Sequence, residues 1–233
     1  MKKLLFDIKP LDQKRSPSVQ DSLDKFGAKL KSFKAKPLGE RPCIIIDNGS
    51  YEARAGWSFD EEPYLQFRNL VAKPKTTVSK TIDSMHLVGD EINEFDASKI
   101  QKRSMFDKNV VYHYQSLEHM LDYTFGHLGL SNESSIEYPV LMTEAMCNPN
   151  YCRSNTSELL FECYRASSVS YAVDALLSFY YNAAKREGDH FNQPTTNGLI
   201  ISSSYQSTHV MPIFDGSLSL ENTKRLSLGG AHH

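Results

Sequence analysis

Cysteine is scarce in this chain, and several other signals are missing. Only four cysteines occur among 233 residues, and their irregular spacing excludes a disulfide framework. The single C-x4-C pair has no second pair near it, so reduced buried thiols are favoured over a metal site. A low-complexity tract and an apolar run of roughly 18–20 residues, as needed to span a bilayer, are also absent. Because Asp7 interrupts the apolar stretch near the start, no secretory signal is predicted, and we expect a soluble intracellular protein.

Charge is distributed unevenly along the chain, although the net charge is only −2. Residues 1–40 hold ten Lys and Arg against five Asp and Glu, a balance of +5, so the remainder carries −7. A basic leader before an acidic body is typical of an interaction arm joined to a globular module. With 40% hydrophobic residues in the chain, the body can fill a sizeable core.

The leader, residues 1–40, is predicted to contain an amphipathic helix at about 17–36. Ser16 and Pro17 suit the N-cap and the first helical position, and apolar residues then recur at alternating spacings of four and three. Docking on a protein, contact with DNA phosphates and binding to an anionic membrane are open readings, with docking first and the membrane last. The candidate partner or DNA contacts are Val19, Leu23, Phe26, Leu30 and Phe33, with Lys25 and Lys29 beside them.

Strand and helix patterns alternate through the body and predict an α/β fold, a mixed sheet with flanking helices. The apolar run at 43–47 has no polar face, so it predicts a central strand. Further strands are expected at 53–57, 64–67, 139–143, 198–202 and 208–214. Helices are expected from Ser116, at about 153–164 and at about 169–182. Residues 68–104 are poorly patterned, with 87–88 as their only strand-like segment.

One local plan occurs twice, about 155 residues apart. An apolar strand, a loop of small residues and a returning strand occur at 43–57 and again at 198–214. Two such hairpins would direct their loops at a shared cleft between two related lobes. The expected domains are a first lobe at 41–185 with a small outer subdomain at 68–104, a linker at 186–197, and the incomplete start of a second lobe at 198–233.

Five segments in order resemble the actin family, over about residues 41–231. They are 46–50 with 53–57, 88–91, 139–145, 148–149, and 208–213 with 225–226. The resemblance implies an actin-like fold of the ribonuclease H-like, Hsp70-type class. Segments 157–164 and 198–203 narrow it to the nuclear actin-related subunits of INO-eighty-class nucleosome remodellers. That class implies a remodeller ATPase, a small partner subunit and the nucleosome, with its histones and DNA, as partners. It also implies the nucleus as location, with the cytoplasm second.

The first phosphate loop keeps part of what an actin-type ATPase needs. By resemblance, Asp47 is the carboxylate on the metal side, and Asn48, Gly49 and Ser50 keep the approach to phosphate. Arg54 replaces a lysine, which preserves charge but not the geometry of a point charge. From the residues alone, Asp47 could instead cap its own turn, and the following three residues could form a simple turn.

The second phosphate loop departs from the family pattern. By resemblance it should read Asp-x-Gly-Asp-Gly, and here it reads Ser202, Ser203, Ser204, Tyr205 and Gln206. Both carboxylates and both glycines are gone, so a cation loses half of its anionic surroundings and Cβ atoms lie where backbone should approach phosphate. Glu158 stands where the family has a glutamine that orients water, and its charge would repel a γ-phosphate. His209 is expected to be a core histidine.

The sequence therefore predicts a non-catalytic scaffold for nucleosome sliding, transcription regulation and DNA repair, with no metal site. No cofactor is expected, except ATP as a structural ligand of a longer chain. The alternative is an actin- or Hsp70-type ATPase with atypical phosphate loops, which the intact 47–50 segment favours. The resemblance also implies a truncated chain that lacks the adenine pocket, which would leave apolar edges exposed at 198–214.

Overall fold

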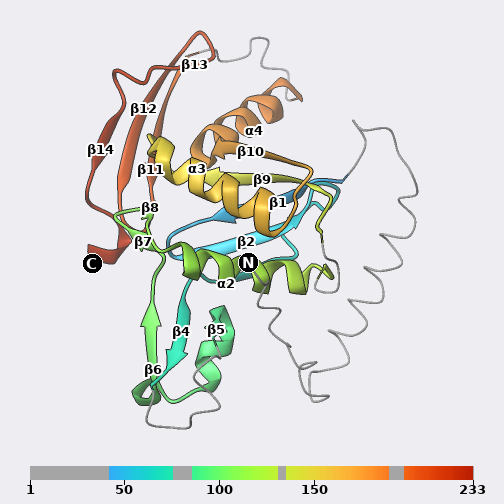
Figure 1. The fold of residues 1–233 in the computed structure, drawn as a ribbon. Coiled ribbons are helices and arrows are strands. Elements are labelled where there is room, and N and C mark those ends of the chain that lie inside the picture. Colours follow the sequence, from blue (N-terminus) through green and yellow to red (C-terminus); the bar gives the residue numbers. More distant parts are fainter. Residues whose placement is uncertain (1–41, 76–85, 131–134, 189–196, 233) are drawn as a thin grey trace.

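The computed structural model describes residues 42–75, 86–130, 135–188 and 197–232. The predicted leader helix and its candidate contact residues therefore lie outside the described residues. The described elements confirm a mixed α/β architecture with flanking helices (Figure 1). None of the helices in the described ranges has the length and hydropathy that crossing a bilayer requires.

A five-stranded sheet forms the centre of the molecule. Its order is β10-β9-β1-β2-β3, with β10, β9 and β1 parallel and β1, β2 and β3 antiparallel. The strands are β1 (Ile44–Asn48), β2 (Glu52–Trp57), β3 (Leu65–Arg68), β9 (Pro139–Glu144) and β10 (Ser168–Val173). The expected central position of β1 is confirmed, and its Ile44 and Ile46 are fully buried. An apolar strand without a wet face is stable only where neighbours cover it.

The helix predicted at about 169–182 is wrong in its first part. Residues 168–173 form strand β10, and helix α4 (Asp174–Gly188) begins only after it. β10 pairs in parallel with β9 over six positions, including Tyr171 opposite Met142. The carboxylate of Asp174 then accepts a hydrogen bond from the Ala175 N–H at 2.7 Å, which satisfies one of the N–H groups at the start of α4. The helix also extends beyond residue 186, where the linker was expected to begin.

Two helical segments complete the first core. They are α2 (Tyr114–His127) and α3 (Asn150–Glu158), which continues as a π-helical turn (Leu159–Cys163). Leu117, Met120 and Leu121 of α2 are fully buried in one cluster with Ile44 and Ile46 of β1. The Tyr164 hydroxyl after the π-helical turn donates to the Asp122 carboxylate at 2.8 Å, so both segments are held on the same core.

A smaller sheet projects away from the central sheet (Figure 1). Its order is β5-β4-β6, from β4 (Val71–Pro74), β5 (Leu87–Val88) and β6 (Ile100–Arg103), with the 3-10 turns Gly89–Glu94 and Ala97–Lys99 between them. β4 and β6 were not expected, because each has only four residues: β4 has two buried apolar residues, and β6 has one. A separate cluster of Ala72, Leu87, Ile92 and Ile100 stabilises this unit. A two-stranded hairpin, β7 (Phe106–Asp107) and β8 (Val110–Val111), follows it.

A four-stranded sheet forms the last part of the chain. It contains β11 (Gly198–Ser203), β12 (Thr208–Phe214), β13 (Ser217–Leu218) and β14 (Lys224–Leu226), before the 3-10 turn Gly230–His232. Helix α4 contacts both β10 and β11, and Gly198 leaves room for Phe179, whose ring would lie 2.9 Å from an added Cβ. Met146, Ala175 and Met211 form a buried cluster that joins this sheet to the first lobe. Leu199 and Ile201 on the edge strand β11 are exposed.

Candidate functional site

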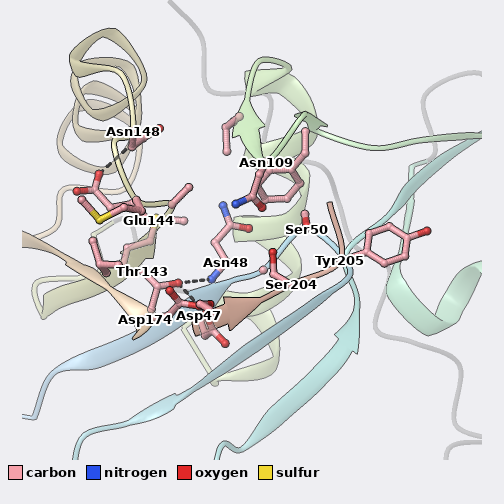
Figure 2. A pocket seen from close by; sticks show the side chains of 18 of the residues that line it. Asp47, Asn48, Ser50, Asn109, Thr143, Glu144, Asn148, Asp174, Ser204 and Tyr205 are labelled. Atoms are coloured by element: carbon pink, nitrogen blue, oxygen red, sulfur yellow. Dashed lines mark hydrogen bonds between the residues drawn. The ribbon is translucent and has the colours of Figure 1, made fainter. Parts of the chain in front are cut away.

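A cavity of about 380 Å³ lies between the tips of the two predicted hairpins (Figure 2). Most of the predicted site residues line it: Asp47, Asn48, Gly49, Ser50 and Arg54 from the first hairpin, and Ser202, Ser203, Ser204 and Tyr205 from the second. Glu158 is exposed at the end of α3 and does not line the cavity. Gln206 is not among the residues that line the cavity, but its side-chain oxygen accepts a hydrogen bond from the N–H of Asn109, which does line it. The structure therefore brings the two loops together but leaves Glu158, the residue expected to replace a water-orienting glutamine, outside the cavity lining.

Asp47, at the end of β1, is tied to strand β9 rather than to its own turn. The Thr143 hydroxyl donates to Asp47 Oδ1 at 2.7 Å and accepts from the Asn48 N–H at 3.0 Å. One hydroxyl thus joins the carboxyl ends of two parallel strands. The described contacts do not match the turn-capping alternative for Asp47, because its partners lie outside the turn.

Arg54 points back to carboxylates of its own hairpin. Its guanidinium lies 3.3 Å from Asp47 Oδ2 and 2.7 Å from Glu52 Oε2. A cation that is engaged in this way has less of its charge to offer a ligand. The expectation that Arg54 stands in for a phosphate-binding lysine is therefore not matched by its described contacts.

Asn69 is a positioning residue of the first loop that sequence reasoning missed. Its side-chain amide donates to Asn48 Oδ1 and to the Gly49 carbonyl, both at 2.8 Å, and its backbone N–H donates to the Tyr51 carbonyl at 3.0 Å. Asn69 is almost fully buried. The two bonds of the buried amide and the one of the backbone N–H fix the loop, because an unpaired polar group there would be costly. The segment around Asn69 has no pattern that could have indicated this role.

Asp174 is a further carboxylate of the cavity, besides Asp47, Glu52 and Glu144, and the helix predicted at about 169–182 had it in its interior. Figure 2 shows it beside Asp47, and it lines the same cavity. Burial raises the pKa of Asp174; the Ala175 N–H opposes this shift, the charge of Asp47 adds to it, and His209 opposes it. The junction of β10 and α4 therefore places a carboxylate beside Asp47.

His209, on β12, lines the cavity and is buried as well. Burial lowers the pKa of His209, the charge of Arg225 lowers it further, and Asp174 opposes the shift. The Nε2 atom of this histidine has no hydrogen-bond partner among the described residues. The expected core histidine is thus also part of the cleft wall, and its burial disfavours the charged imidazolium.

Polar groups of the second loop form hydrogen bonds within its own turn. The Ser204 N–H donates to the Ser207 carbonyl at 2.9 Å, and the Ser204 hydroxyl donates to the same oxygen at 3.0 Å. The N–H groups of Gly230 and Ala231 donate to the carbonyls of Ser204 and Tyr205 at 3.1 and 2.7 Å. A Cβ at Gly229 would lie 2.5 Å from the Ser204 carbonyl oxygen. Residues 229–231, which follow β14, therefore pack against the second loop and form hydrogen bonds with it. In the described ranges, no group of three or more His, Cys, Asp and Glu could hold a metal ion.

Comparisons with known proteins show what the chain is similar to. The family model described as Actin matches residues 39–232. The chain is similar to actin-related protein 5 of Drosophila melanogaster, with 39% identity over 211 residues that cover 84% of this chain and 31% of that protein. It is 40% identical to actin-related protein 5 of Homo sapiens over 207 residues, 85% of this chain and 33% of that protein. For actin-related protein 5 of Dictyostelium discoideum the identity is 43% over 200 residues, 86% of this chain and 27% of that protein.

The chain thus spans about a third or less of the length of these curated relatives. Their shared name confirms the resemblance to actin-related protein 5.

Proposed function

The chain belongs to the actin family, and from this premise we propose that it acts as a non-catalytic scaffold subunit of an INO-eighty-class nucleosome remodeller. Its partners would be the remodeller ATPase, a small partner subunit, and the histones and DNA of the nucleosome. Its work would be nucleosome sliding in the nucleus, with consequences for transcription and DNA repair. The similarity to actin-related protein 5 supports the choice of assembly.

One observation carries the non-catalytic part: the groups that should grip a magnesium triphosphate are engaged with each other. Arg54 is held by Asp47 and Glu52, Asp47 accepts from Thr143, and the Ser204 N–H closes its own turn. Asp174 places a further carboxylate in the cavity, where the charge of Asp47 acts on it. These residues do not fit a bound magnesium triphosphate, so we derive no hydrolytic step. In other enzymes, loss of one preorganised donor alone raises the barrier by about 3 kcal/mol.

A hydrolysis assay tests the non-catalytic part. Phosphate release from Mg-ATP by the purified chain should equal that of the Asp47→Asn variant, because the proposal assigns Asp47 no chemical role. Asparagine can still accept the hydrogen bond from Thr143, so it is a matched replacement. Release above that of the variant, with a melting temperature that Mg-ATP raises only in the unmodified chain, would favour the ATPase alternative.

A complementation assay tests the scaffold part. Removal of the protein from the remodeller should reduce nucleosome sliding, and the unmodified chain and the Asp47→Asn variant should restore it equally. If the variant fails to restore sliding while it still assembles with the remodeller ATPase, the cleft performs chemistry and the scaffold proposal is wrong. If neither chain assembles with the remodeller ATPase or its small partner subunit, the choice of assembly is wrong.

The basic leader is proposed as a contact to the partner or to nucleosomal DNA. Lys25→Glu combined with Lys29→Glu should weaken salt-sensitive binding of the full chain to nucleosomes, because phosphate contacts release counterions. Lys73→Glu combined with Lys102→Glu changes the net charge equally at exposed positions of the small sheet and serves as the control. Equal loss in both variants would show that net charge, rather than the leader, determines binding.

A further inference from the structure

Both hairpins that enclose the cavity end in a two-residue tip, and each tip carries a tyrosine. The pairing of Asn48 with Ala53 leaves Ser50 and Tyr51 at the first tip, beyond Gly49 and Glu52. The pairing of Ser203 with Thr208 leaves Tyr205 and Gln206 at the second tip. The rings of Tyr51 and Tyr205 contact each other, with centroids 4.9 Å apart and planes inclined by 53°. The two tips therefore touch directly across the mouth of the cavity.

Tyr51 is held for this contact from its other face. The guanidinium carbon of Arg68 lies 3.4 Å from the centre of the Tyr51 ring, a distance at which a cation is attracted to the ring face. The carbonyl of Tyr51 also accepts the Asn69 N–H. Tyr51 thus lies between a cation of the first lobe and an aromatic ring of the second.

A second link joins the lobes at the turn between β7 and β8. Lys108 and Asn109 have φ angles of 46° and 73°, which is the left-handed geometry of a tight hairpin turn. The Asn109 N–H donates to the Gln206 side-chain oxygen at the second tip. The Arg225 guanidinium on β14 donates to the Lys108 carbonyl. This turn therefore binds both the tip and the neighbouring strand of the second lobe.

We infer that these protein contacts hold the two lobes together across the cleft and take over the linking role that a nucleotide gripped by both loops would have. Direct ring contact between the tips leaves no gap at that point for a phosphate to bridge. The link has an aromatic part at the tips and a hydrogen-bonded part at the β7–β8 turn. Below it, the buried Met146, Ala175 and Met211 join the same two lobes. The inference concerns the fold of the cleft and does not depend on the choice of remodeller.

Amide hydrogen exchange tests the aromatic part on the full chain. Tyr51→Ala should speed exchange at residues 203–208, on the opposite hairpin, by about three- to tenfold, as expected for local opening after loss of an aromatic pair. Exchange in α2, which has no contact with either tip among those described, should not change. Tyr51→Phe keeps the ring and should keep the protection. The melting temperature should fall by about 2–4 °C in the alanine variant.

A double-substitution cycle makes the test independent of general destabilisation. Tyr51→Ala and Tyr205→Ala should each lower the melting temperature, and together they should lower it by less than the sum, because the second change finds the contact already lost. Tyr180→Ala, at an exposed position of α4, is the control and should add independently to either. Strict additivity of the tip variants, or unchanged exchange at 203–208, would overturn the inference. The inference would also be overturned if Mg-ATP slowed amide exchange in both hairpins equally in the unmodified chain and in Tyr51→Ala, because a nucleotide would then link the two loops. Turnover of ATP with an intact tip contact would refute only the proposed function.

Discussion

Replacement of the Thr143 hydroxyl should destabilise the cleft although it changes no group that could do chemistry. Thr143 is the point where β9 meets β1: its hydroxyl donates to Asp47 at 2.7 Å and accepts from the Asn48 N–H at 3.0 Å. Thr143→Val keeps the branched shape and the β-strand preference but removes both bonds. The variant leaves a carboxylate oxygen and a backbone N–H short of a partner in a half-buried place.

The magnitude follows from these two bonds. A hydrogen bond to a charged group contributes about 1.5–3 kcal/mol and a neutral one about 0.5–1.5 kcal/mol. Because water reaches both bonds in part, the low end applies, so the loss is about 2 kcal/mol. In a chain of this size, that loss lowers the melting temperature by about 4–8 °C.

Thermal unfolding followed by circular dichroism measures this effect, and Thr143→Ser is the matched control. Serine keeps the hydroxyl and loses only a methyl group, so Thr143→Ser should lose less than half of the stability that Thr143→Val loses. The reasoning is refuted if the valine variant melts within about 1 °C of the unmodified chain, well inside the expected shift. It is also refuted if serine and valine destabilise equally, because the methyl group would then be the important part.

Four further outcomes follow from the structure. Leu117→Ala, at a fully buried position of α2, should lower the free energy of unfolding by about 2–5 kcal/mol in denaturant titration. Gly49→Ala should cost about 1–3 kcal/mol in the same titration, because an added Cβ would lie 2.6 Å from the Glu52 carbonyl oxygen. Burial, with two neighbouring histidines, lowers the pKa of His119 to about 4. Because the unfolded chain binds this proton at about pH 6.5, stability should fall as the pH drops from about 6.5 towards 4. The melting temperature of His119→Gln should vary less over that range. Ser202→Asp combined with Ser204→Gly should still give no Mg-ATP binding by calorimetry, because Arg54 of the first loop stays paired with Asp47 and Glu52. Tight binding by this variant would show that the second loop alone prevents nucleotide binding.

The two hairpins could be predicted from the sequence because each has apolar strands on both sides of a short loop of small or polar residues. The prediction of a helix at about 169–182 was wrong in its first part because the apolar residues there fit a helical period, while Ser168–Val173 also fits a strand. What decides between them is pairing with β9, about 30 residues earlier in the chain. Strands β4 and β6 escaped prediction for the opposite reason, since each has four residues and a weak apolar pattern.

The positions of the loop residues were predictable, but their partners were not. Thr143 lies 95 residues from Asn48, and Asn69 lies 20 residues from Gly49, so no local spacing indicates these contacts. Asp174 was hidden for a related reason: once β10 is read as helix, the carboxylate at its end no longer points to the sheet edge where Asp47 lies. The residue types were enough to name candidate site residues. Their contact partners depend on the order of the strands in the sheet, which the sequence pattern does not show.

The intact first loop is therefore weak support for retained chemistry. In a nucleotide site, one ligand constrains both loops, so the two loops should change together when that constraint is lost. Here the first loop has protein reasons for its sequence: Thr143 holds Asp47, Asn69 holds Asn48, and Gly49 has no room for a side chain. The second loop has different reasons, since its backbone closes its own turn and rests on the segment around Gly229. Each loop thus keeps what its own packing needs, which explains how one can retain the family pattern while the other has lost it.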